Sequence, residues 1–198
     1  MNIFVLHPNP RKSARWHVDK HVIKMLLETC QLLYTAHWIL AYPDLKTHKS
    51  VIGLSKAQKK LDPPASMETA PHSDSGLVGY RPCHIHHPCA VWTRRSSGNY
   101  HWLATLGIHL AAEYRFRFGK THSCEQHIHW LFIHLPRGIK PHPRRSFAIA
   151  MADEYRISSN PIICYRHYYR TAKAEKGLIR YTKRHIPHWF TRTDDSNE

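Results

Sequence analysis

The stretch from Ser13 to Leu33 constrains the fold more than any other part of the chain, because its apolar residues recur at intervals of three and four. In a helix this spacing turns one stripe of side chains toward a core. The stripe comprises Val18, Val22, Met25, Leu26, Thr29, Cys30 and Leu33. The sequence therefore predicts an amphipathic helix that is capped by Ser13 and ends before Pro43, because the residue preceding a proline is disfavoured in helical geometry.

The opposite face of this predicted helix carries a row of titratable side chains. At steps of four, three and four, the row contains His17, His21, Lys24 and Glu28, with Asp19 and Lys20 alongside. One helix face thus stacks two imidazoles, an ammonium and a carboxylate. The row is either an ordinary solvated face with a weak spaced ion pair, or the chemical part of a site.

The rest of the chain predicts a mainly α fold, a single helical domain over residues 1–190. Residues 2–6 form a buried strand or a short N-terminal extended arm, and residues 44–80 form a loop-rich insertion with a basic short helix followed by a flexible loop. Helical patterns return at 88–118, where Gly98 marks a break or a cap, at 127–134 and at 162–173. Residues 191–198 read as a disordered acidic tail.

Charge is the strongest compositional signal. Lys and Arg total 29 against 14 Asp and Glu, which gives a net charge of +15 with histidine neutral, and the chain has 19 histidines. Such an excess favours a polyanionic partner, and we expect that partner to be nucleic acid, DNA in particular. No apolar run is long enough to cross a membrane, no signal peptide is evident, and the five cysteines lack the density of a disulfide framework, so we expect no membrane partner and a cytoplasmic location.

Aromatic residues interleaved with arginines and lysines suggest where nucleic acid binds, because aromatic planes stack on bases while cations neutralise phosphates. Core packing, however, explains some of these aromatic residues, and we expect Trp102 to lie inside the protein. The candidate nucleic-acid-binding residues are Arg94, Arg95, Asn99, Tyr100, Arg115, Lys120, Arg166, Tyr169 and Lys173.

Two patterns raise the alternative of a divalent metal such as zinc, although no cofactor is otherwise expected. His109 and Glu113 lie four apart, and a helix carrying them that packs against the first would give the set His17, His21, His109 and Glu113, a metal site or an acid/base cluster. The segment 83–89, with two cysteines and three histidines, is either a zinc half-site or a turn into a helix. Neither a GxGxxG or Walker-type loop nor a zinc-deaminase signature is present.

The order of motifs resembles a family of small proteins from tailed phages and large DNA viruses. The resemblance is carried by residues 1–6, the His17-x-Asp19-Lys20-His21 helix, His87-Pro88 followed by Trp92, Arg94, Asn99, Tyr100 and Trp102, then Glu113-Tyr114 to Lys120, and Tyr165-Arg166-x-Tyr168-Tyr169. More distantly, the plan is similar to the T4-type pyrimidine-dimer DNA glycosylases. That resemblance implies an all-helical enzyme inside an infected cell that cuts the glycosidic bond of damaged pyrimidines with an N-terminal amine and a helix glutamate.

Two departures from that pattern concern the catalytic groups. Asn2 is bulkier than the residues that normally permit removal of the initiator methionine. The position where the family has its glutamate falls near Lys24, which is not a carboxylate. The implied chemistry would therefore use the amine of Met1, Lys20 or Lys24 as the nucleophile. Its acid/base would be Asp19, Glu28 or Glu113.

Three hypotheses follow for the function. The leading one is a viral DNA glycosylase and abasic-site lyase whose catalytic residues are drawn from His17, Asp19, Lys20, His21, Lys24 and Glu113. The second is a metal-dependent nuclease or phosphoesterase that uses His17, His21, His109 and Glu113. The third is a non-catalytic nucleic-acid-binding protein.

Overall fold

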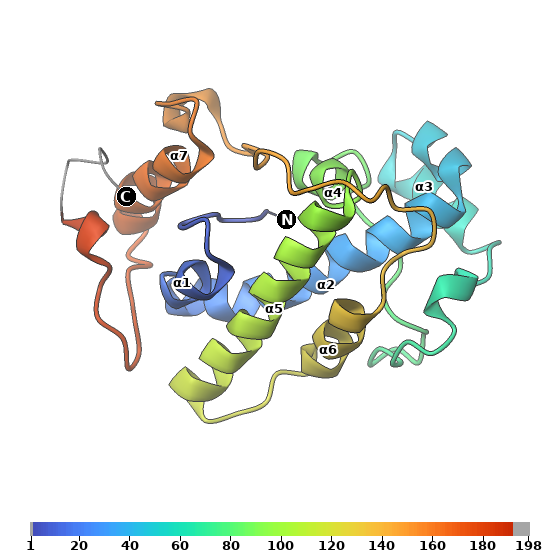
Figure 1. The fold of residues 1–198 in the computed structure, drawn as a ribbon, viewed down its shortest axis with the longest axis horizontal. Coiled ribbons are helices and arrows are strands. Elements are labelled where there is room, and N and C mark those ends of the chain that lie inside the picture. Colours follow the sequence, from blue (N-terminus) through green and yellow to red (C-terminus); the bar gives the residue numbers. More distant parts are fainter. Residues whose placement is uncertain (1, 192–198) are drawn as a thin grey trace.

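A computed structural model describes residues 2–191, and this part of the chain is built from helices, turns and extended segments without a β-strand (Figure 1). The predicted mainly α fold is confirmed. The α-helices are α1 (Pro10–Arg15), α2 (Asp19–Ala41), α3 (Val51–Gln58), α4 (Pro88–Thr93), α5 (Ser97–Phe118), α6 (Glu125–Ile133) and α7 (Pro161–Tyr168). Short helical turns are η1 (Pro43–Thr47), η2 (Ala65–Met67), η3 (Asp153–Tyr155), the π-helical η4 (Tyr169–Lys173) and η5 (His188–Phe190). Of the predicted tail, all but Thr191 lies outside the described residues.

The two long helices α2 and α5 cross at the centre, and α1, α4 and α6 pack around the crossing (Figure 1). Every residue of the predicted apolar stripe on α2 is buried. The three helices pack tightly at Gly107 of α5, where a Cβ atom would lie 2.7 Å from Ile128 of α6 and 3.1 Å from Thr29 of α2. The period-based prediction of the core face of α2 is therefore confirmed.

The start of the first helix differs from the prediction. Asn9, not Ser13, caps α1, and Ser13 lies inside α1, where its hydroxyl accepts a hydrogen bond from the backbone nitrogen of Leu6. The chain then breaks, and α2 begins only at Asp19. The break is stabilised by Arg117 of α5, which donates to the carbonyl oxygens of Arg15 and His17, each at 2.8 Å. A buried guanidinium thus replaces the intrahelical hydrogen bonds that these carbonyls would otherwise make.

Residues 2–6 form the extended arm allowed by the sequence and not a strand. Its residues 3–6 are buried. The Asn2 side chain donates to the carbonyl of Ala150, and the Arg166 guanidinium of α7 donates to the carbonyl of Leu6. The second of these bonds satisfies an arm carbonyl that would otherwise be buried without a partner, and the first ties the start of the arm to residue 150.

The predicted insertion at 44–80 contains η1, α3 and η2, and its later part packs onto the core instead of projecting from it. Leu54 and Met67 are buried, and Gly79 (φ +58°) passes so close to Tyr34 that a Cβ would lie 2.6 Å from its ring. Parts of the expected flexible loop therefore pack onto the core, at Met67 and Gly79, whereas residues 74–77 are exposed.

The break predicted at Gly98 falls at residues 94–96, and Gly98 is the second residue of α5. Glycine is needed there because the segment 139–146 crosses the start of α5, where a Cβ would lie 2.3 Å from the Arg144 nitrogen. The two remaining helical predictions are confirmed as α6 and as α7 with η4. In the described part of the chain, no helix has both the length and the apolar character that a membrane crossing requires.

Candidate active site

Glu28, in the middle of α2, has a buried carboxylate that contacts the N-terminal arm and the side chain of Lys24. The residue is 6 % exposed, and its Oε2 accepts a hydrogen bond from the backbone nitrogen of Asn2 at 2.7 Å. Its Oε1 lies 3.3 Å from Nζ of Lys24, whose side chain is 62 % exposed. The predicted i, i+4 pair therefore exists, but its carboxylate is buried and in contact with the N-terminal arm. Met1, named above as an amine donor, lies outside the described residues.

Two neighbours orient the arm at this carboxylate. The Asn2 side-chain oxygen accepts hydrogen bonds from the hydroxyl of Tyr165 at 2.9 Å and from the thiol of Cys89 at 3.4 Å. Burial raises the pKa of Cys89 to about 12 and raises the pKa of Tyr165 as well, so both groups keep their protons and remain donors. The position of the Asn2 backbone nitrogen beside Glu28 is thus set by α4 and α7.

His17 and His21 lie under the arm in an aromatic cluster. The Phe4 ring stacks on His21 with ring centroids 4.3 Å apart, and Nδ1 of His21 forms a hydrogen bond with the Tyr169 hydroxyl. Burial lowers the pKa of His17 to about 4 and that of His21 to about 2, so both imidazoles are neutral at neutral pH. Nδ1 of His17 must carry the proton, because it faces the Ser13 carbonyl at 2.7 Å, and the buried Nε2 has no hydrogen-bond partner.

Asp19 and Glu113 meet in a buried ion network around Arg117. The Arg117 guanidinium lies 3.1 Å from each carboxylate, and Arg184 donates to Glu113 at 2.6 Å. Thr182 donates to Asp19 through both its backbone nitrogen and its hydroxyl. The start of α2 and the end of α5 are therefore brought together, and the carboxylates of Asp19 and Glu113 are paired with Arg117 in the interior. Lys20 lies exposed on α2.

The alternative metal ligands are not gathered in this way. Within residues 2–191, no group of three or more His, Cys, Asp or Glu side chains is placed to hold a metal ion. His109 and Glu113 instead border a small cavity of about 200 Å³ whose other lining residues include Arg11, Arg15 and Arg184. The segment 83–89 is the turn into α4, and Nδ1 of His87 accepts from the Cys89 nitrogen as the helix cap.

The candidate nucleic-acid-binding residues divide by exposure. Arg95, Arg115 and Lys120 are exposed, although Arg115 pairs with Glu125, and Arg94 and Lys173 are partly exposed. Asn99, Tyr100 and Tyr169 are fully buried, and their polar atoms bond to protein groups. Arg166 is 7 % exposed and lies over the rings of Trp16 and Trp189. Trp102 is inside as expected, and its indole nitrogen donates to the Pro8 carbonyl.

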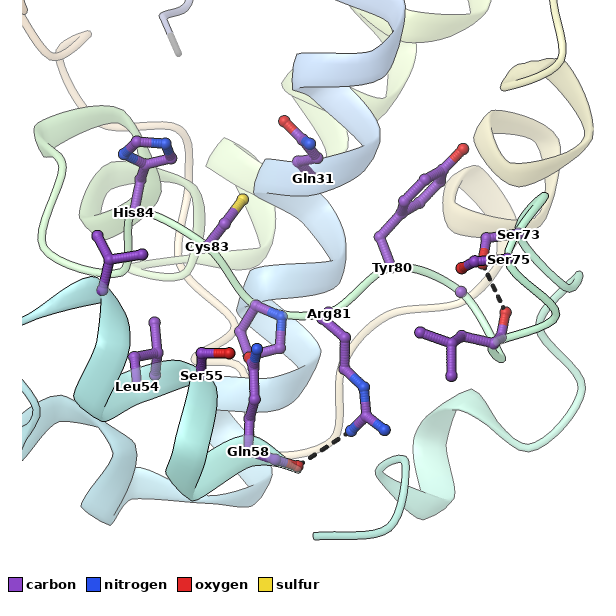
Figure 2. Close-up of a pocket in the computed structure, with 14 residues that line it drawn as sticks. Gln31, Leu54, Ser55, Gln58, Ser73, Ser75, Tyr80, Arg81, Cys83 and His84 are labelled. Atoms are coloured by element: carbon purple, nitrogen blue, oxygen red, sulfur yellow. Dashed lines mark hydrogen bonds between the residues drawn. The ribbon is translucent and has the colours of Figure 1, made fainter. Parts of the chain in front are cut away.

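A pocket of about 390 Å³ lies beside the Glu28 face of α2, with walls from α2, α3 and residues 73–84 (Figure 2). Gln31, one turn after Glu28, lines it. The side chain of Arg81 is fixed by donating to the carbonyls of Gln58 and Leu61. The polar groups that line the pocket are Gln31, Ser55, Gln58, Ser73, Ser75, Tyr80, Arg81, Cys83 and His84. Sequence analysis missed this pocket, because the serine-rich loop that forms one wall carries no periodic signal.

Lys24, Glu28 and the pocket residue Gln31 thus follow one another along α2, which gives an amine, a buried carboxylate and a polar pocket along the helix. No protein-family model, curated protein or solved structure matches this chain.

Proposed function

We propose that this protein is a nucleic-acid-processing enzyme, a DNA glycosylase and abasic-site lyase, with Glu28 as its acid/base and Lys24 as its amine nucleophile. The observation that carries the proposal is the 3.3 Å approach of the exposed Lys24 amine to the 6 % exposed Glu28 carboxylate. An amine beside a general base is the arrangement that nucleophilic catalysis at a sugar carbon requires. Of the predicted catalytic residues, this proposal keeps only Lys24 as the nucleophile, and it takes Glu28 as the acid/base in place of Asp19 or Glu113.

The chemistry follows from these two groups. The Lys24 nitrogen forms a bond to C1′ of the deoxyribose while the glycosidic bond breaks, and the leaving base takes that bond's electron pair and a proton. Glu28 relays the two protons that the Lys24 ammonium gives up, one to the leaving base and one to O4′ as the sugar ring opens, and it is a carboxylate again after each transfer. After the sugar ring opens to an iminium, the carboxylate can remove a proton from C2′, and the electron pair expels the 3′ phosphate. Water then hydrolyses the imine and restores the amine.

The pocket lined by Gln31 supplies a place for the base. A base must leave the stack before an enzyme can reach its sugar, and hydrogen-bonding groups around the base offset the cost of a few kcal/mol. Amide and hydroxyl side chains in the pocket can donate and accept. The net charge of +15 and exposed cations such as Arg95 and Lys120 favour the phosphate backbone.

Borohydride trapping on an abasic duplex tests the nucleophile. Reduction of the imine should attach the DNA covalently to the wild-type protein, and Lys24→Arg should abolish trapping because an arginine keeps the charge but is not a comparable nucleophile. Lys59→Arg, at an exposed lysine at the end of α3, is the matched control and should trap as well as the wild type. Full trapping by Lys24→Arg would remove Lys24 from this role.

Mass spectrometry of the trapped peptide separates two amines at the same carboxylate. If Met1 is removed, the Asn2 nitrogen becomes a primary amine 2.7 Å from Glu28. An adduct on the amino-terminal peptide would assign that nitrogen, and an adduct on Lys24 would assign the side chain. Glu28→Gln should lower processing by at least about 100-fold while DNA binding is kept, as expected for loss of general acid/base catalysis. Tight binding without product on damaged, modified and abasic DNA would reject the enzymatic proposal.

A further inference from the structure

A second pocket, of about 380 Å³, lies at the C-terminal end of α4 and is strongly basic. We call it the basic pocket. It is lined by Leu40, Lys46, Val91, Arg94, Arg95, Gly138, Lys140, His142 and Arg145. Five of these residues are cationic, a sixth is histidine, and none is acidic. Mutual repulsion of cations in one small space is relieved when an anion binds among them.

Arg94 shows that the basic pocket lacks a counter-charge from its own lining. Its Nη1 is buried and has no hydrogen-bond partner in the structure, and burial lowers the pKa of the guanidinium. Buried guanidinium nitrogens elsewhere in the described chain are paired, as Arg117 is with Asp19 and Glu113. Arg94 therefore lines the basic pocket with a guanidinium that has one buried donor without a hydrogen-bond partner.

The walls of the basic pocket are fixed relative to one another by buried hydrogen bonds. The Asn99 side chain donates to the carbonyl of Trp92 on α4 at 2.7 Å and accepts from the backbone nitrogen of Arg145 at 2.8 Å. Backbone nitrogens at the start of α5 donate to the carbonyls of Lys140 and His142. The close approach at Gly98 allows this docking. The backbone positions that carry these cations are thus fixed relative to one another by the fold.

We propose that the basic pocket binds a phosphate group and that its ligand is a backbone phosphate of the nucleic acid held at Glu28. Arginine side chains bind phosphate with two parallel hydrogen bonds, which a carboxylate-free cluster leaves available. α4 joins the two places, because Cys89 in its first turn contacts Asn2 of the arm, and Arg94 follows its last turn about 8 Å along the axis.

Phosphate binding by the basic pocket is independent of the chemistry at Glu28, whereas its assignment to nucleic acid rests on the proposed function. The test variant is Arg94→Gln with Lys140→Gln, and the control is Lys49→Gln with Lys59→Gln, which removes the same charge from exposed positions outside the pocket. Inorganic phosphate, compared with chloride at equal ionic strength, should raise Tm of the wild type and the control by about 2 to 4 °C and leave the test variant unchanged. An equal rise in all three proteins would overturn the phosphate site.

Binding to undamaged DNA at several salt concentrations tests the nucleic-acid assignment without any catalysis. Each lost phosphate contact should reduce the slope of log K against log salt by about 0.9 for a duplex. The test variant should show this reduction beyond any seen in the control, and Glu28→Gln should keep the wild-type slope. A test variant that loses the phosphate effect on Tm yet keeps the wild-type DNA slope would show a free-phosphate site and would overturn the assignment to nucleic acid.

Failure of this proposal is distinguishable from failure of the proposed function. Glu28→Gln reports on the chemistry, and the salt slope of the test variant reports on the basic pocket. A protein that binds DNA through the basic pocket but forms no product would retain this inference and lose the enzymatic proposal.

Discussion

Asp19 and Glu28 are two carboxylates on the same helix, 7 % and 6 % exposed, and the chain surrounds them in different ways. Asp19 is bound by Arg117, which is buried in the core, and by Thr182. Glu28 is bound by the N-terminal arm and by an amine that is mostly in solvent. The comparison teaches that two carboxylates equally buried on one helix can differ in the exposure of their cationic partners, because the Arg117 side chain is fully buried whereas that of Lys24 is 62 % exposed.

Arg117→Met should have the largest effect on stability. The substitution removes the cation between two buried carboxylates and the donor to two backbone carbonyls. Breaking a buried ion pair from one side costs about 3 to 5 kcal/mol of unfolding free energy, measurable by urea denaturation. Arg156→Met is the control, because its ion pair with Asp153 is exposed and should contribute less than about 1 kcal/mol. Equal losses in the two variants would contradict the role given to Arg117.

The two carboxylates can be compared directly with isosteric amides. Asp19→Asn puts an amide opposite the donors of Arg117 and Thr182 and should cost about 1.5 to 3 kcal/mol, the range for hydrogen bonds to charged groups. Glu28→Gln still offers an oxygen to the Asn2 nitrogen, and its partner Lys24 is mostly exposed, so we expect the loss of that pair to cost less than about 1 kcal/mol. Equal costs in denaturant unfolding would make Glu28 a structural group and weaken the catalytic proposal.

Acid should destabilise the protein through the buried histidines that precede Glu28 on the chain. The pKa of His17 is about 4 in the folded protein and about 6.5 when unfolded, so the unfolded chain binds more protons as pH falls. The contribution is fully present above about pH 6.5 and lost toward pH 4, with about 2 kcal/mol gone at pH 5. His21 acts in the same direction. His17→Gln should flatten the pH dependence of unfolding, whereas replacement of the exposed His101 by Gln should leave it as in the wild type.

Local sequence pattern was sufficient to predict the core face and end of α2 and the positions of α6 and α7, but not which segments cover these helices. The stripe on α2, its end before Pro43 and the positions of α6 and α7 all follow from spacing and prolines. His17 and His21 were assigned to a polar face by the same spacing, yet Phe4 and Tyr169 cover them. Periodicity separates two faces of a helix, but it does not say whether a distant segment will bury the polar one.

The parts of the site that the sequence did not predict depend on long-range contacts. The break at residues 16–18 is stabilised by Arg117, a hundred residues away from His17. The resemblance to glycosylases placed the helix glutamate near Lys24, and the carboxylate that meets the arm is one turn later, at Glu28. The sequence shows Lys24 and Glu28 as an i, i+4 pair. Only the contact of the N-terminal arm with Glu28 distinguishes this pair from a common surface ion pair.

Lys24→Met should have the smallest effect on stability and forms a matched pair with Arg117→Met. The Lys24 side chain is 62 % exposed, so water solvates its ammonium group and salt screens its interaction with Glu28. The expected change in unfolding free energy is below about 0.5 kcal/mol at low salt and should vanish in concentrated salt. A loss of several kcal/mol would mean that the Lys24 pair supports the fold as Arg117 does. A stable Lys24→Met protein that no longer traps an abasic duplex would instead separate stability from chemistry within one helix.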